Sequence, residues 1–294
     1  MTSLEQDDSL SAAANADEAP PAPRPQSLML SFFGIHALGR STAIAAGSLI
    51  DVFARTGITE EAVRSTLTRM VRRGLLERHR RGRKTYFGIT PRAASVLQDG
   101  HDRIWRTGAV NRDWDGTWTV VGFSLPEAWR RERHDLRSRL VWGGFGPLQN
   151  GMWVSPGTVD VPALVEGLGL DAQLKVFRGA MTAGPTDARG VLAAAFDIDG
   201  IAAGYRTFLE RWDGPAPANS GSDDLARQLL LHTDWLDLVR RDPHLPAEHL
   251  PADWPAGRAE EMFRSLARRY GGTARHEAAR LLDSIEVPEA GTAG

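Results

Sequence analysis

The chain has 294 residues, of which 42% are hydrophobic and 24% charged, and its formal net charge at pH 7 is −2. This length allows two or three domains with a substantial core, and the composition is ordinary for a soluble protein. The elements predicted below make the expected fold class α+β. The absence of cysteine excludes disulfides, thiolate catalysis and cysteine-based zinc sites. We expect a cytoplasmic protein with no membrane partner, because neither a secretory signal nor a run of about 18 apolar residues is visible.

Positive charge is concentrated in one part of the chain. Residues 25–106 carry 14 Lys or Arg and 6 Asp or Glu, a net charge of +8, whereas residues 1–24 have a net charge of −4 and residues 107–294 one of −6. A run of charges usually marks a solvated face, but a basic surplus confined to one domain is typical of a surface that meets nucleic-acid phosphates. The elements predicted within this basic part favour the second interpretation.

The N-terminal part begins with a tail and two helices. Residues 1–26 are rich in Ala, Pro, Ser and acidic residues without periodicity, which predicts a disordered tail. An apolar run at 27–38 predicts a first core helix, and residues 47–54 predict a second helix before the turn at Thr56-Gly57.

A third helix follows from residue 60. Val63, Leu67, Met70 and Gly74 share one face at helical spacing, which leaves the other face free for a partner. Thr59 is the expected N-cap, and Gly74 is expected to stop the helix.

A basic hairpin comes next. Strands are predicted at 75–78 and 85–90, and Gly82 permits the turn between them. Two helices, a turn, a third helix and a hairpin form a winged helix-turn-helix, which we assign to residues 27–107, with 91–107 as a connecting helix. The candidate DNA-binding residues lie on the third helix and at the hairpin tip: Arg64, Ser65, Thr68, Arg69, Arg72, Arg80, Arg81, Arg83 and Lys84.

The middle of the chain predicts a second domain, at residues 108–184. A strand at 117–124, a helix at 126–140, a strand pair at 147–155, a short helix at 163–168 and a strand at 172–181 give the order β-α-β-β-α-β. That order indicates a ferredoxin-like sandwich.

Residues 185–294 predict a helical C-terminal domain. Helical spacing is found at 201–211, 222–240, 257–270 and 273–282. Residues 242–255 between them contain too many prolines for a regular helix.

Several of these segments resemble the PaaX family of bacterial repressors, named for the phenylacetate-degradation regulator. The matching pieces, spread over about residues 27–285, are Ala62-Val63-Arg64 with Leu67 and Arg69, Gly74-Leu75-Leu76, Arg81-Gly82-Arg83 with Tyr86, Thr90-Pro91-Arg92, and the connector from Asp242 to Pro255. The resemblance implies a repressor that binds a double-stranded DNA operator and is released by a small-molecule effector, an acyl-CoA such as phenylacetyl-CoA. It also implies a ferredoxin-like middle domain. Operator symmetry requires two recognition helices, so we expect a homodimer.

Two alternatives remain open at this point: a metal-dependent nuclease and a ligand-independent architectural DNA-binding protein. A nuclease of this type needs carboxylates near the end of the first strand of the middle domain, where the nearest acidic residue is Glu127. We predict no catalytic residue, metal or cofactor. The loop at 141–146 lacks a Walker lysine, and His244 and His249 have no further ligands at a recognisable spacing, so we expect them at the surface or in packing.

The nine tryptophans are the candidates for effector binding. Most are expected in the core, because large aromatic side chains bury area efficiently. A subset is predicted to line an aromatic pocket between the middle and C-terminal domains: Trp118, Trp142, Trp153 and Trp212. The arginine-rich helix at 130–139 is better explained as a solvated face or a domain interface than as a site for coenzyme A phosphates.

Overall fold

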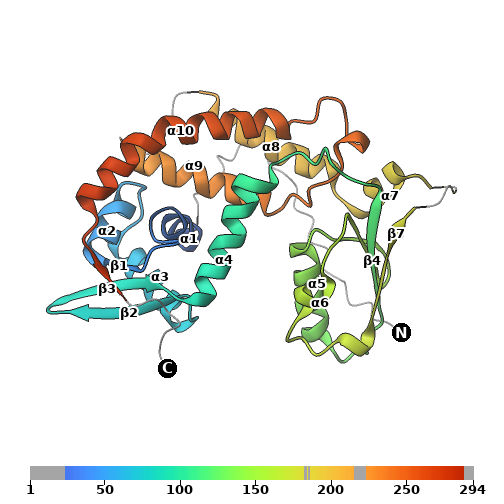
Figure 1. Cartoon of the computed structure of the whole chain (residues 1–294), viewed down its shortest axis with the longest axis horizontal. Helices are drawn as coiled ribbons and strands as arrows, with labels where there is room; N and C mark the ends of the chain where they lie inside the picture. The colour runs from blue at the N-terminus through green and yellow to red at the C-terminus, as the bar shows by residue number, and fades with distance from the viewer. Residues whose placement is uncertain (1–23, 182–183, 185, 215–222, 288–294) are drawn as a thin grey trace, which may run out of the picture.

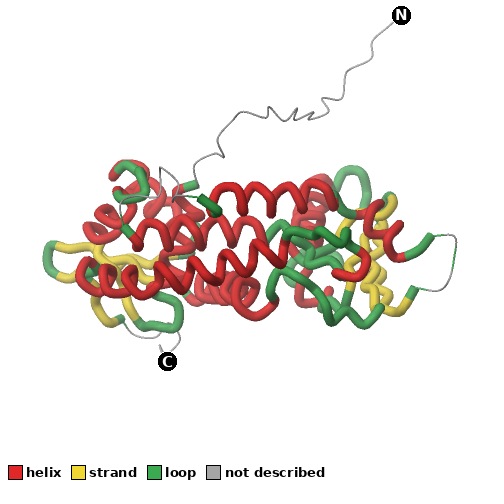
Figure 2. The backbone as a smooth tube through the Cα atoms, turned by 90° about the horizontal axis from the view of Figure 1, so that it is seen from above, coloured by secondary structure: helices red, strands yellow, loops and turns green. Residues whose placement is uncertain are grey.

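The structure is a computed structural model that describes residues 24–181, 184, 186–214 and 223–287. It is a mixed α+β protein with two four-stranded sheets. Long helices run between the sheets, which lie at opposite ends of the molecule (Figures 1 and 2). Residues 1–23 of the predicted tail lie outside the described residues, while Pro25 and Gln26 already belong to the first helix rather than to the tail. None of the described helices is both long enough and apolar enough to cross a membrane.

The N-terminal part contains four α-helices, a short strand and a hairpin. In chain order these are α1 (Pro25–His36), β1 (Thr42–Ala45), α2 (Ala46–Ala54), α3 (Glu60–Arg72), β2 (Leu76–Arg81), β3 (Lys84–Ile89) and α4 (Pro91–Asp102), which continues as a π-helical turn, η1 (Arg103–Thr107).

Helix α3 begins and ends as its sequence predicts, but its buried face differs by one position. The Thr59 hydroxyl accepts a hydrogen bond from the Ala62 N–H at 3.3 Å and caps the helix. Thr66 is buried beside Met70 on the packed face. Gly74 was predicted on that face but is exposed, because its φ of 66° turns the chain out of the helix.

The first sheet has the order β2-β3-β1-β8 and is antiparallel throughout. Neither β1 nor β8 (Ser284–Glu286) is among the predicted strands. β1 is four residues long and β8 three, too short to display a strand pattern. Their conformation is set by pairing, since β8 lies along β1 with Ala43 opposite Ile285. The last described part of the chain therefore completes the N-terminal sheet.

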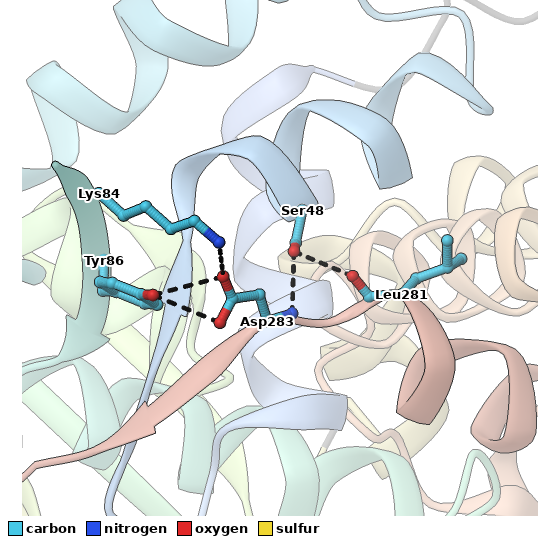
Figure 3. A network of polar contacts seen from close by, with 5 residues as sticks. All are labelled: Ser48, Lys84, Tyr86, Leu281 and Asp283. Atoms are coloured by element: carbon cyan, nitrogen blue, oxygen red, sulfur yellow. Dashed lines mark hydrogen bonds and ion pairs between the residues drawn. The ribbon is translucent and has the colours of Figure 1, made fainter. Parts of the chain in front are cut away.

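A polar network fixes the approach to β8 (Figure 3). The Ser48 hydroxyl donates to the Leu281 carbonyl at 2.9 Å and accepts from the Asp283 N–H at 2.9 Å. The Asp283 carboxylate in turn accepts from the Lys84 ammonium at 2.7 Å and from the Tyr86 hydroxyl at 3.3 Å. One residue, Asp283, therefore connects the end of the long C-terminal helix to α2 and to the hairpin.

The middle part has the order of strands and helices predicted for it. Its elements are β4 (Thr117–Phe123), α5 (Arg130–Trp142), β5 (Gly146–Gln149), β6 (Met152–Pro156), α6 (Val161–Val165), the 3₁₀ turn η2 (Asp171–Gln173) and β7 (Leu174–Ala180). The sheet order is β5-β6-β4-β7, with all pairs antiparallel. Helix α5 starts four residues later than predicted, because Pro126 opens a turn that the Trp129 N–H closes.

The C-terminal part is helical. Its helices are α7 (Ala188–Ala195), α8 (Ile198–Trp212), α9 (Asp224–Val239), the 3₁₀ turn η3 (Ala247–His249) and α10 (Ala256–Leu281). Two predicted helices, 257–270 and 273–282, are one helix of 26 residues. Glycines at 271 and 272 cost about 1 kcal/mol each relative to alanine. Packing of α10 on α9 offsets that cost, with the rings of Phe263 and Trp235 stacked 4.7 Å apart.

The N-terminal part and the C-terminal helices share one hydrophobic core. A single cluster of buried side chains runs from Leu28 in α1 through Val63 in α3 to Trp235 in α9 and Ala278 in α10. Arg55 at the end of α2 also forms an ion pair with Asp223, the N-cap of α9. The core of the middle part is separate and contains Leu136, Leu140 and Trp153 among others.

Removing the β8 strand should destabilise the N-terminal sheet. A chain truncated after Leu282 loses the β1–β8 ladder and all contacts of Asp283, and at about 1 kcal/mol per net hydrogen bond we expect a fall of about 2–4 kcal/mol in the free energy of unfolding. Urea denaturation measures this difference. Truncation after Val287 keeps the ladder and is the matched control. Equal stability of the two truncated chains would contradict a structural role for β8.

Candidate nucleic-acid interface

The outward face of α3 is polar and basic. Arg64, Ser65, Thr68 and Arg72 are exposed, and together with Glu60 and Glu61 they line a shallow depression on the helix surface, so the first turn of the helix is acidic and the basic residues follow it. Glu60 pairs with Arg64 at 2.7 Å within the helix. Because an exposed pair of this kind contributes only about 0.3–0.5 kcal/mol, a phosphate can displace the carboxylate at little cost.

Two predicted contact residues on α3 make internal hydrogen bonds. The Thr68 hydroxyl donates to the Arg64 carbonyl at 2.9 Å, and its oxygen can still accept a hydrogen bond because the residue is exposed. Arg69 is half-buried, and its guanidinium donates to the Thr66 hydroxyl at 3.1 Å. Arg69 is therefore the least accessible of the five candidates on this helix.

The β2–β3 hairpin projects from one end of the molecule (Figure 1). Arg81 pairs with Lys84 in the last register position, and Gly82, with a φ of 60°, forms the turn. The four predicted basic residues of the tip are all exposed, namely Arg80, Arg81, Arg83 and Lys84. The hairpin tip therefore carries three arginines and one lysine that are accessible to a binding partner.

The charge of Lys84 is partly neutralised inside the chain. Its hydrogen bond to Asp283 and the charge of that carboxylate raise the pKa of the Lys84 ammonium. The same hydrogen bond lowers the pKa of the Asp283 carboxyl. Because the two residues are 199 positions apart, no sequence pattern predicts the pair.

The four predicted effector-binding tryptophans do not line one cavity. Trp118, Trp153 and Trp212 are buried in three different hydrophobic clusters. Trp212 also donates its ring N–H to Asp234 at 3.0 Å. Trp142, at the end of α5, is half-buried and lines a cavity of about 650 Å³. Three of the four are therefore packing residues in the structure.

The cavity lies between the N-terminal part and the C-terminal helices. Its walls come from α1, α4, α9 and α10, with Trp142 contributed by the middle part. The guanidinium carbons of Arg103 and Arg240 each lie 4.7 Å from the centroid of the Trp142 ring. His232 lines the cavity and is fully buried, which lowers the pKa of its imidazole to about 4 and keeps it neutral at pH 7. No sequence pattern predicts this cavity, because its residues come from elements far apart in the chain.

The proline-rich connector is held by a buried carboxylate. Asp242 accepts hydrogen bonds from the Tyr205 hydroxyl and, at 2.7 Å, from the His244 N–H, and burial raises the pKa of the Asp242 carboxyl. The His244 carbonyl accepts from the Asn111 side chain at 3.2 Å. The His249 ring packs edge-on against Trp114 at 5.3 Å. The His249 ring therefore has a packing role, whereas His244 is held through its backbone and its buried Nε2 makes no hydrogen bond within the described residues. No group of three or more His, Asp or Glu side chains suited to a metal occurs in the described residues.

The arginine-rich helix α5 serves the fold at two of its five arginines. Arg133 donates to the carbonyls of Leu125 and Pro126 at 3.0 Å, and Arg139 donates to the carbonyl of Leu164 at 3.0 Å. The other three are exposed: Arg130, Arg131 and Arg137. This arrangement agrees with the interpretation of α5 as a solvated face.

Each of the three parts of the chain matches a known protein family model. Residues 24–93 match the family description "PaaX-like protein", residues 111–191 match "PaaX protein central Cas2-like domain", and residues 196–280 match "PaaX-like protein C-terminal domain". The chain belongs to the PaaX family of transcriptional regulators.

Individual relatives agree with this assignment. The chain is similar to the transcriptional repressor PaaX of Escherichia coli K12, with 26% identity over 260 residues that cover 84% of this chain and 81% of the relative. It is also similar in structure to uncharacterized protein Rv0674 from Mycobacterium tuberculosis, with a TM-score of 0.60, 21% identity, and coverage of 87% of this chain and 99% of that one. At that identity the second likeness concerns the fold alone.

Substitution of Asp283 tests the ion pair at the hairpin directly. In the Asp283→Asn variant the pKa of the Lys84 ammonium should fall toward its ordinary value of 10.5, because both the charge and the strong acceptor are lost. NMR titration of the lysine side-chain nitrogens measures this, and the chain has only one other lysine, Lys175, in the second sheet. A Lys84 titration that is the same in both proteins would show that the pair does not form in solution.

Proposed function

We propose that the chain is a sequence-specific, DNA-binding transcriptional repressor of the PaaX type, acting in the cytoplasm. In this proposal residues 27–107 function as a winged helix-turn-helix, with α3 as recognition helix and the β2–β3 hairpin as wing. The observation that carries it is the exposed polar face of α3, with Arg64 and Arg72, together with the basic tip of the hairpin, in a relative of a transcriptional repressor.

The exposed residues divide by the chemistry they offer to DNA. Ser65 and Thr68 are short polar side chains at the centre of the α3 face and are proposed to meet base edges in the major groove. Arg64, Arg69 and Arg72 are proposed to contact bases or phosphates. At the tip, Arg80, Arg81, Arg83 and Lys84 are proposed to hold the DNA backbone, with Lys84 contributing least because Asp283 already shares its charge.

Symmetry leads to the proposal of a homodimer. A pseudo-palindromic operator needs two recognition helices about 34 Å apart, one turn of the duplex. One chain contains a single α3. Two copies of the chain on one operator are therefore proposed.

For the middle part we propose a ferredoxin-like domain of residues 108–184, followed by a helical domain from residue 185. The proposal is supported by the strand order β5-β6-β4-β7 and by two helices that connect its strands. A nuclease is not favoured, because β4 ends at Phe123 and the nearest acid along the chain, Glu127, is a lone exposed carboxylate.

Release from DNA is proposed to follow binding of a small-molecule effector, with an aromatic acyl-CoA such as phenylacetyl-CoA as the compound that the family suggests. Such a ligand must bind more tightly to the arrangement that cannot hold DNA, by about 1–3 kcal/mol for a 5- to 150-fold loss of affinity.

Removal of two charges from the hairpin tip tests its role as a wing. The variant Arg81→Ala/Arg83→Ala should bind all DNA sequences more weakly, and the slope of log affinity against log salt should fall by about 0.9 per lost phosphate contact. Fluorescence anisotropy at several salt concentrations gives the slope. Arg130→Ala/Arg131→Ala removes two exposed arginines from α5 and serves as the control with equal net charge. Equal slopes for the two variants would remove the hairpin from the interface.

Selection from random duplexes tests the repressor proposal as a whole. The full chain should enrich a pseudo-palindromic sequence, and light scattering of the complex should give a protein mass of twice 32.1 kDa. Enrichment of no particular sequence would favour the architectural alternative, and cleavage of the duplex with Mg²⁺ would favour the nuclease. A single chain both free and on DNA would refute the homodimer.

A further inference from the structure

The cavity between α1, α4, α9 and α10 has the properties of a ligand site. We propose that it binds an organic anion with a flat, apolar body, and that it is the effector site of the repressor, an inference that rests on the function proposed above. Its volume of about 650 Å³ falls in the range of about 300–1,000 Å³ that is usual for small-molecule sites.

The walls supply apolar contacts for the body of the ligand. Leu97 and Ile104 of the α4 segment are buried at the cavity, and Leu30 and Leu236 face them from α1 and α9. Val96 also lines the cavity and leaves 44% of its surface exposed. Trp142 is the lining residue contributed by the middle part. An aromatic or acyl group of a ligand would cover these exposed apolar atoms.

Positive charge at the cavity supplies the preference for an anion. Arg240 contacts the Trp142 ring, and Arg268 and Arg275 lie about two turns apart on α10. None of the three forms an ion pair within the described parts of the chain. No Asp or Glu is among the lining residues in those parts either. Arginine is the usual partner of carboxylate, sulfonate and phosphate groups.

The position of the cavity connects it to the proposed DNA-binding elements. Helix α4 follows directly from β3 of the hairpin, and α10 leads into Asp283, which bonds to Lys84 and Tyr86. A ligand between α4 and α10 therefore contacts both chain segments that lead to the hairpin. Different spacing of these helices in two arrangements of the protein would give the ligand different affinities for them.

A pair of fluorescent probes tests the proposed chemistry on the full chain without DNA. The aromatic sulfonate 8-anilinonaphthalene-1-sulfonate should bind once per chain, about tenfold more tightly than the neutral N-phenyl-1-naphthylamine, which has the same rings. Arg268→Gln and Arg275→Gln should each reduce this preference. Arg269→Gln is the matched control, because Arg269 is the next exposed arginine on α10 but lines a different pocket. Equal affinity of the two probes for the unmodified chain would overturn the assignment to an anion.

A blocking variant tests the location. A Cβ atom at Gly271 would lie 3.5 Å from the Gln228 amide, inside the lining of the cavity, so Gly271→Leu should abolish sulfonate binding. Leucine is a better helix former than glycine, and circular dichroism should show an intact fold. Thr273→Leu, at an exposed α10 position outside the lining, is the control. Undiminished binding by Gly271→Leu would overturn the site, as would a change in its oligomeric mass, which would identify the cavity as an interface between copies.

Competition identifies the source of the anion. Displacement of the sulfonate by phenylacetyl-CoA but not by phenylacetate would identify the thioester conjugate, and the reverse would identify the free acid. Displacement by neither would overturn the arylacetyl group as the ligand of this cavity. Because these titrations contain no DNA, their failure would leave the proposed DNA binding untouched, and failure to select an operator would leave the ligand site untouched.

Discussion

The hydrogen bonds of Asp283 join the end of helix α10 to the N-terminal sheet, and the position of β8 depends on them. The backbone N–H of Asp283 binds the Ser48 hydroxyl, 235 positions away, and its carboxylate binds Lys84 and Tyr86 in β3. Bringing such distant residues together has an entropic cost of loop closure. Burial of the shared core from α1 to α10 offsets that cost. The β8 strand therefore depends on the packing of the helices, and it covers the outer side of β1 and leaves a strand of only three residues at that edge of the sheet.

Much of the fold could be predicted because local signals were strong. The α3 helix has an N-cap at Thr59, a periodic apolar face and a glycine stop, so three independent signals agree. Where such signals were weak, prediction failed. The strand β1 contains two alanines in four residues and acquires its conformation from its neighbours. The pair Gly271-Gly272 looked like a break, but packing on α9 carries α10 through it.

The exposed residues of the candidate DNA-binding surface were easier to predict than the residues of the cavity. Exposure of Arg64, Thr68 and Arg72 follows from helical periodicity, which is a property of adjacent sequence. The cavity depends on how helices from both chain ends meet. Of the tryptophans predicted to bind the effector, only Trp142 lines this cavity. Sequence alone could not distinguish a tryptophan in the core from one in a pocket, because both are large and apolar. Prediction of such a site requires the relative placement of elements, which amphipathic patterns do not specify.

The pairing of β1 with β8 has a consequence for the nascent chain during translation. At about 5–20 residues per second, Ser48 is synthesised roughly 10–50 s before Asp283. During that interval β1 can pair with β3 but has no partner on its other side. An unpaired strand edge is a template for strands of other chains. Until β8 has been synthesised, the free edge of β1 can therefore pair with a strand of a neighbouring nascent chain on the same polysome. A chaperone that covers this edge of β1 would have to act before translation ends.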